Sequence, residues 1–114
     1  MDDHGVNGVT IIDILASLER RGFYGGAIDR NRAGEQVYAV IEELGEVARL
    51  LRRHAQGVAE LQNTKLSVEC CDVVIAAVCL LGQVAGITAS GLLRAKLAMD
   101  EQRGYLHNGG GDGA

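Results

Sequence analysis

The sequence predicts an all-α protein with a single domain. None of the 114 residues is proline and only 4% are aromatic, whereas β-sheet proteins draw on aromatic residues and on turn prolines. The length is close to that of one common domain, and 47% apolar with 23% charged residues is typical of a soluble globular fold. The net charge of -4 argues against a nucleic-acid polymer as a partner.

The first predicted helix follows a flexible N-terminal end, residues 1–8. Thr10 and Asp13 have the spacing of a capping box, in which each side chain accepts a hydrogen bond from the other residue's backbone N–H. The pattern therefore predicts a helix that begins just after Thr10. Glycines favour helix ends and loops, and three of them predict the end of this helix and a loop to about Asn31: Gly22, Gly25 and Gly26.

The second predicted helix, from about Asn31 to about Ala55, is strongly amphipathic. We expect its apolar side to face the core, and this side consists of Val37, Val40, Ile41, Leu44, Val47, Ala48 and Leu51. The opposite, charged side consists of Glu42, Glu43, Glu46, Arg49 and Arg53.

The third predicted helix, roughly Thr64 to Ala85, is apolar around its whole circumference. A helix of this kind must be buried on all sides, which is difficult for one chain of this size. We therefore expect part of it to pack against a second subunit, in a homodimer or a homotetramer built as a dimer of dimers. Its longest apolar run, Val73 to Gly82, is too short to span a bilayer, so no membrane association is expected.

A fourth predicted helix, capped by Thr88 or Ser90, runs to about Arg103. The glycine-rich tail, residues 108–114, is expected to be disordered. Residues 9–107 are thus expected to form one domain that resembles a four-helix bundle.

The cysteines and the N-terminus indicate a cytoplasmic protein. Cys70, Cys71 and Cys79 lie within one apolar segment without a CxxC pair or a distant partner, so we expect small core residues in a reducing compartment. The first residues have neither the basic nor the apolar region of a signal peptide.

Two groups of carboxylates point to a metal site. On the second predicted helix Glu43 and Glu46 are i, i+3 neighbours with Glu42 beside them, and these like charges repel one another. On the third, Glu69 and Asp72 project from an apolar segment, where ionised carboxylates are costly unless they are compensated. A divalent cation held between the helices would compensate them, and oxygen ligands suit Mg²⁺ or Mn²⁺. A solvated charged face is the alternative for the second helix taken alone.

A third cluster, Lys96, Asp100 and Arg103, forms one stripe on the fourth predicted helix. Taken alone, this stripe is typical of a salt-bridged surface. Beside a metal site it gains a second interpretation, because phosphates bound to a metal need cationic side chains for their remaining oxygens.

These motifs together resemble the all-α nucleoside triphosphate pyrophosphohydrolases of the MazG type. The family pattern is E-E-x-x-E, a spacer, E-x-x-D, and then a basic helix with a lysine and an arginine. The matching segments are Glu42-Glu43-Leu44-Gly45-Glu46, 22 intervening residues, Glu69-Cys70-Cys71-Asp72, and Lys96-Leu-Ala-Met-Asp100-Glu-Gln-Arg103. Many relatives have asparagine where this chain has Asp100, so Asp100 is expected to hold a metal-bound water or to pair with Arg103.

The resemblance implies Mg²⁺-dependent hydrolysis of a nucleoside triphosphate to the monophosphate and pyrophosphate. The implied metal ligands are Glu43, Glu46, Glu69 and Asp72, and Glu42 would orient the attacking water. Lys96 and Arg103 would stabilise charge on the phosphates. The base pocket stays undefined, and the aromatic residues that could stack on a base are Phe23, Tyr24 and Tyr38.

Two alternatives stay open at this point. A phosphoribosyl-ATP pyrophosphohydrolase has a similar helical architecture and similar acidic motifs. A non-catalytic helical module that dimerises through the third helix would explain its apolar circumference, although not the carboxylates within it.

Overall fold

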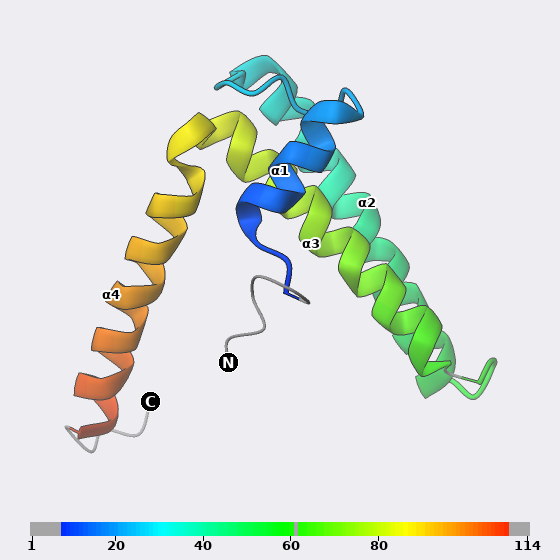
Figure 1. Ribbon diagram of the computed structural model, residues 1–114. Coiled ribbons are helices and arrows are strands. Elements are labelled where there is room, and N and C mark those ends of the chain that lie inside the picture. Colours follow the sequence, from blue (N-terminus) through cyan, green and yellow to red (C-terminus); the bar gives the residue numbers. More distant parts are fainter. Residues whose placement is uncertain (1–7, 61, 110–114) are drawn as a thin grey trace.

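The computed structural model describes residues 8–60 and 62–109, and every regular element in this part of the chain is a helix (Figure 1). In chain order the elements are α1 (Ile11–Arg20), α2 (Arg30–Ala55), α3 (Asn63–Ala85), the 3-10 helix η2 (Gly86–Thr88) and α4 (Ala89–Gly109). The predicted all-α class is confirmed. Most of the residues predicted to be flexible, 1–7 and 110–114, lie outside the described chain, whereas residues 108 and 109 of the predicted tail form the end of α4.

The capping box at the start of α1 is confirmed. The Asp13 N–H donates to Thr10 Oγ1 at 3.1 Å, and the Thr10 N–H donates to Asp13 Oδ2 at 3.0 Å. These two bonds satisfy backbone donors that the first turn of a helix leaves without partners. Local chemistry therefore fixes where α1 begins.

Helices α2 and α3 form an antiparallel hairpin, and α1 packs across α3 near its C-terminal end (Figure 1). The core at this junction consists of Leu18, Tyr24 and Cys79. Gly82 leaves room for the Leu15 and Tyr24 side chains, because a Cβ atom there would lie 2.5 Å from Leu15 Cδ2 and 3.2 Å from the Tyr24 ring. The buried end of the hairpin is thus fixed by α1 and by the loop that follows it.

The buried side chain of Gln83 ties this loop to α3. Its Nε2 donates to the Phe23 backbone carbonyl oxygen at 3.3 Å, and the backbone carbonyl oxygen of Gln83 accepts from the Asp29 N–H at 2.8 Å. Asp29 in turn caps α2, since its carboxylate accepts from the Arg32 N–H. The start of α2 is therefore held in register with the end of α3.

The face of α2 that packs against α3 differs from the predicted one. The partly buried positions in the middle of α2 are Gln36, Ala39, Val40, Glu43, Val47 and Leu50. Most of the predicted core face is exposed instead, including Ile41 at 58% and Leu44 at 50%. The expectation that this face forms the core holds only for the partly buried Val40 and Val47 and is wrong for its other residues. The placement of Glu43 on the opposite, solvated side is also wrong. Periodicity locates the most apolar stripe of a helix, but does not show what covers it.

Burial of α3 on all sides is not provided by the single chain. Its C-terminal end is buried at Val78, Cys79 and Ala85, whereas Val68 and Val74 are more than half exposed. The core prediction is confirmed for Cys79 and is wrong for the exposed thiols Cys70 and Cys71.

Helix α4 is longer than predicted and projects away from the other helices (Figure 1). Its contacts with α1 and α3 are made near its start, and residues 94–104 are exposed. The radius of gyration is 17.3 Å, whereas about 13 Å is expected for a compact chain of this length. The single chain is therefore not a closed bundle.

The continuous helical run from Asn63 to Gly104 contains a window with mean hydropathy 2.1 that is long and apolar enough to cross a membrane by length and composition. This differs from the expectation based on the shorter run Val73 to Gly82. Helices in the core of soluble proteins have the same property, and 39% of this window is buried inside the chain.

Candidate metal centre

Three carboxylates from two helices converge at the middle of the α2–α3 hairpin. Glu43 comes from α2, and Glu69 and Asp72 come from α3; one oxygen of each lies within 4.8 Å of the others. Glu43 and Glu69 are partly buried and Asp72 is exposed. We call these residues the acidic triad.

The triad follows from the antiparallel register of the hairpin. Glu43 lies on the face of α2 that packs against α3, in line with the partly buried Val40 and Val47. Glu69 and Asp72 are one turn apart on α3 and point to the same side. Two helices therefore deliver three acceptors to one place, as a hard divalent cation requires.

The environment raises the pKa of Glu43. Burial is the largest cause, and the negative charges of Asp72 and Glu69 add to it, followed by those of Glu42 and Glu46. Among the described residues no lysine, arginine or histidine nitrogen lies within 4.0 Å of a triad carboxylate. The triad thus carries negative charge that the described residues do not neutralise directly.

The raised pKa of Glu43 predicts a pH dependence of stability in metal-free protein. Because folded Glu43 binds a proton more readily than an unfolded glutamate, with its pKa of 4.5, its contribution to stability is fully present below that value. The contribution should be lost as the pH rises through the higher pKa of the folded state. Urea unfolding from about pH 4 to 7 should show that Glu43→Gln removes this loss.

Glu35→Gln, on an exposed position of α2, is the matched control and should keep the wild-type pH dependence. An identical pH dependence in wild type and Glu43→Gln would show that the triad carboxylates do not interact.

The structure leaves two predicted residues outside the triad. Glu46 forms an exposed ion pair with Arg49, with 2.7 Å between Oε2 and Nη2. Glu42 is exposed on α2. The i, i+3 spacing of Glu43 and Glu46 correctly places both on neighbouring positions, but it does not decide which way each side chain turns.

The predicted basic stripe is present on α4 as a chain of ion pairs. Asp100 Oδ1 accepts from Lys96 Nζ at 2.7 Å and from Arg103 Nη2 at 2.5 Å. These hydrogen bonds lower the pKa of the Asp100 carboxyl group. The pairing of Asp100 with Arg103 is confirmed, but the single chain does not bring the exposed stripe to the triad, because α4 makes no contact with α2 in the described residues.

A pocket of about 250 Å³ adjoins the triad on the side of α1, and we call it the α1-side pocket. Glu43 and Asp72 line it together with Phe23 and Gln36. Of the three aromatic candidates for base stacking only Phe23 lines this pocket, since Tyr24 belongs to the core and Tyr38 is 72% exposed. Sequence reasoning missed Gln36, which is two turns before Glu43 on the same face of α2.

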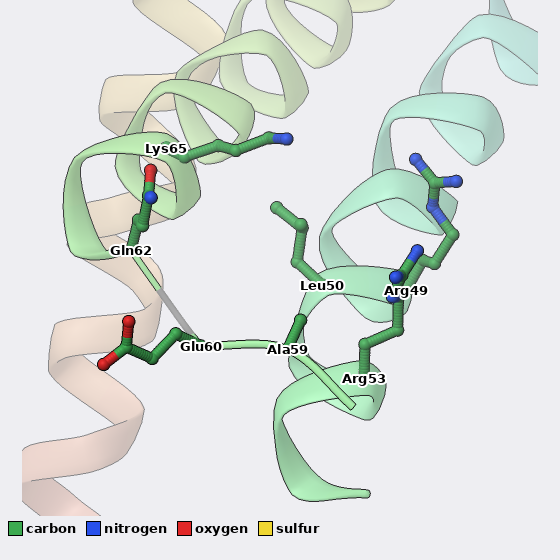
Figure 2. A pocket seen from close by; sticks show the side chains of 7 residues that line it. All are labelled: Arg49, Leu50, Arg53, Ala59, Glu60, Gln62 and Lys65. Atoms are coloured by element: carbon green, nitrogen blue, oxygen red, sulfur yellow. The ribbon is translucent and has the colours of Figure 1, made fainter. Parts of the chain in front are cut away.

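A second pocket of about 250 Å³ lies beyond the triad, at the turn between α2 and α3, and we call it the hairpin pocket (Figure 2). Three cationic side chains line it: Arg49, Arg53 and Lys65. Sequence reasoning placed Arg49 and Arg53 on a solvated face and did not connect them with Lys65. The available signal was the i, i+4 spacing of the two arginines just before a turn.

Comparisons with protein-family models, with characterised proteins and with solved structures find no match for this chain. The resemblance to the MazG type therefore depends on the acidic and basic motifs alone. The geometry of the triad and its two flanking pockets carries the functional interpretation.

Proposed function

We propose that the protein is a metal-dependent hydrolase that cleaves a nucleoside or deoxynucleoside triphosphate to the monophosphate and pyrophosphate. The observation that carries the proposal is the acidic triad, in which Glu43, Glu69 and Asp72 converge from two helices. Among the described residues no basic side chain forms an ion pair with these carboxylates. Oxygen ligands in this arrangement favour Mg²⁺, with Mn²⁺ as the second choice.

The triad would hold the cation, which when bound supplies neutralisation of phosphate charge and activation of water. Glu46 would complete the ligand set by turning away from Arg49. The ion pair that it gives up is half exposed, and such pairs contribute only about 0–1 kcal/mol. Glu42, exposed beside Glu43, would orient the attacking water.

The α1-side pocket would receive the nucleoside. The Arg21 guanidinium lies over the Phe23 ring, 5.5 Å from its centroid, so a base would stack on the other face of the ring. The Gln36 amide donates to the Ala76 carbonyl oxygen at 3.0 Å, which leaves its own oxygen as an acceptor towards a base. This geometry favours a base with an exocyclic amino group, although stacking alone accepts any base.

Lys96 and Arg103 would act on the phosphates across a subunit interface. Within one chain α4 projects away from the triad, so its basic stripe would reach a triad only in another copy. The exposed apolar residues of α2, α3 and α4 support such an assembly, since monomers seldom expose large contiguous apolar surfaces.

Metal binding provides the first test. Mg²⁺ or Mn²⁺ should raise the melting temperature by several degrees, because a ligand at a hundred times its Kd adds about 2.7 kcal/mol of stability. The rise in melting temperature should be much smaller for Glu69→Gln. KCl at equal ionic strength should not raise the melting temperature of the wild type in the same way. An unchanged melting temperature at millimolar metal would contradict a metal centre at the triad.

Activity provides the second test. The protein with Mg²⁺ is incubated with each common and modified nucleoside triphosphate, and with phosphoribosyl-ATP, and pyrophosphate release is measured. Release from one substrate class identifies the reaction, while no release from any of them contradicts the proposed activity.

A non-catalytic helical interaction module is the second candidate, and the exposed apolar faces favour it. Such a module would assemble in the same way but would gain no stability from Mg²⁺. The metal-dependent melting experiment therefore separates the two candidates.

A further inference from the structure

The hairpin pocket gathers positive charge from two helices. Arg49 and Arg53 come from the last turns of α2, and Lys65 comes from the first turn of α3. Figure 2 shows Lys65 reaching from α3 across the pocket towards α2, where the two arginines lie. Leu50 and Ala59 form an apolar part of the wall.

Most of this charge has no partner within the described part of the chain. Only Arg49 forms an ion pair, with Glu46, whereas no described carboxylate lies within 4.0 Å of the Arg53 or Lys65 cation. Glu60 also lines the pocket, but Figure 2 shows its carboxylate directed away from the arginines. The pocket therefore offers two cations without a described ion-pair partner, Arg53 and Lys65, beside the paired Arg49. It is locally positive although the whole chain has a net charge of -4.

The α1-side pocket, the triad and the hairpin pocket follow one another along the α2–α3 hairpin, and we call this line of residues the groove. The α2 residues of this line that border the two pockets have helical spacing, namely Gln36, Ala39, Glu43, Leu50 and Arg53. Glu46 has the same spacing but lines neither pocket. The α3 side is a matching stripe, namely Lys65, Glu69, Asp72, Ala76 and Cys79. The triad thus separates the α1-side pocket from the hairpin pocket.

Helix geometry gives the spacing along this groove. Lys65 is four residues from Glu69, about 6 Å along the axis, and Arg53 is ten residues from Glu43, about 15 Å. An anion bound by Lys65 is therefore about one helical turn away from a cation held by the triad. Arginine forks and a lysine ammonium are the groups that proteins use for phosphate oxygens.

We infer that the hairpin pocket binds a pyrophosphate-class anion, either free pyrophosphate or the terminal phosphates of a nucleotide. The nucleotide case rests on the proposed function; the free anion does not. A nucleotide would then lie along the groove with its base towards α1, its phosphate chain at the triad and its terminal phosphates at the turn between α2 and α3.

The test begins with metal-free protein and inorganic pyrophosphate. Isothermal titration in EDTA should show binding that Arg53→Gln and Lys65→Gln each weaken at least tenfold. Arg52→Gln is the matched control, because Arg52 is an exposed arginine next in sequence that does not line the pocket. Glu69→Gln should bind pyrophosphate at least as tightly as wild type. Melting temperatures of all variants, and rescue by Arg53→Lys, separate loss of the site from loss of fold.

A second arm identifies the source of the anion. In turnover with Mg²⁺, a raised KM in Arg53→Gln but not in Arg52→Gln assigns the pocket to the nucleotide's own terminal phosphates. An unchanged KM together with weakened pyrophosphate binding assigns it to the free anion.

The outcomes distinguish this inference from the proposed function. Absence of pyrophosphate binding, or equal weakening by Arg52→Gln and Arg53→Gln, would overturn the inference even if the protein hydrolyses nucleotides. Pocket-specific binding of pyrophosphate without hydrolysis of any nucleotide would support the inference and contradict the proposed function.

Discussion

Asp72→Asn and Glu69→Gln are expected to reduce nucleotide hydrolysis by at least about a hundredfold, because even changes beyond the direct ligands of a metal cost about 10–100-fold. Metal-free stability should stay the same or rise, since each change removes a charge from a group of mutually repelling carboxylates. Pyrophosphate release and urea unfolding in EDTA measure the two effects on the same preparations.

The control for these variants is Glu35→Gln, which changes a carboxylate on α2 outside the groove and should keep wild-type turnover. Glu46→Gln tests separately whether the Glu46 side chain also binds the metal ion. A loss of hydrolysis as large as that of Asp72→Asn indicates that Glu46 is a fourth ligand. A small loss indicates that the triad alone binds the metal. Full activity in Asp72→Asn and Glu69→Gln would contradict the proposed centre. Unfolding of both variants in EDTA would indicate a structural role.

The proposed assembly predicts that the Ile41→Glu variant exists as single chains. Ile41 is 58% exposed in the single chain, so the substitution does not disturb its core. At a subunit interface an unpaired buried charge costs about 3–5 kcal/mol, and each 1.4 kcal/mol weakens association about tenfold. Light scattering at micromolar concentration measures the mass, which should be that of a dimer or tetramer for wild type and of a monomer for Ile41→Glu.

Val58→Glu, in the turn after α2, is an equally exposed control and should keep the wild-type mass. A charge at Val78 would not test the subunit interface, because Val78 is buried within the single chain and the charge would unfold that chain. A monodisperse wild-type monomer, or an Ile41→Glu variant with wild-type mass, would contradict an interface on this face of α2.

The helix boundaries could be predicted because local signals determine them. Helix α1 begins at the capping box of Thr10 and Asp13 and ends just before Gly22. The predicted starts of α2 and α3 agree with the structure to within a residue. The packed face of α2 could not be predicted in the same way. Its most apolar stripe and its α3-facing stripe differ, and only the tertiary arrangement distinguishes them.

The sequence predicts only part of the candidate metal centre, because the rest depends on the tertiary arrangement. Glu69 and Asp72 could be singled out because a charged pair within an apolar helix needs compensation. That Glu43 and not Glu46 joins them depends on rotamers and on the competing charge of Arg49, one turn further along α2.

The position of α4 depends on Gly86, whose φ of 62° and ψ of -137° set the bend between α3 and α4.

The projecting helix α4 also determines where the single chain opens first. Residues 94–104 are exposed to solvent in the described part of the chain, so little burial offsets the entropy of ordering them, and an isolated helix of this length is marginal in water. Their amide hydrogens should exchange with solvent much faster than those of the core around Cys79. Trypsin should therefore cut the free chain first after Arg94, Lys96 and Arg103, and any partner that covers α4 should protect these bonds.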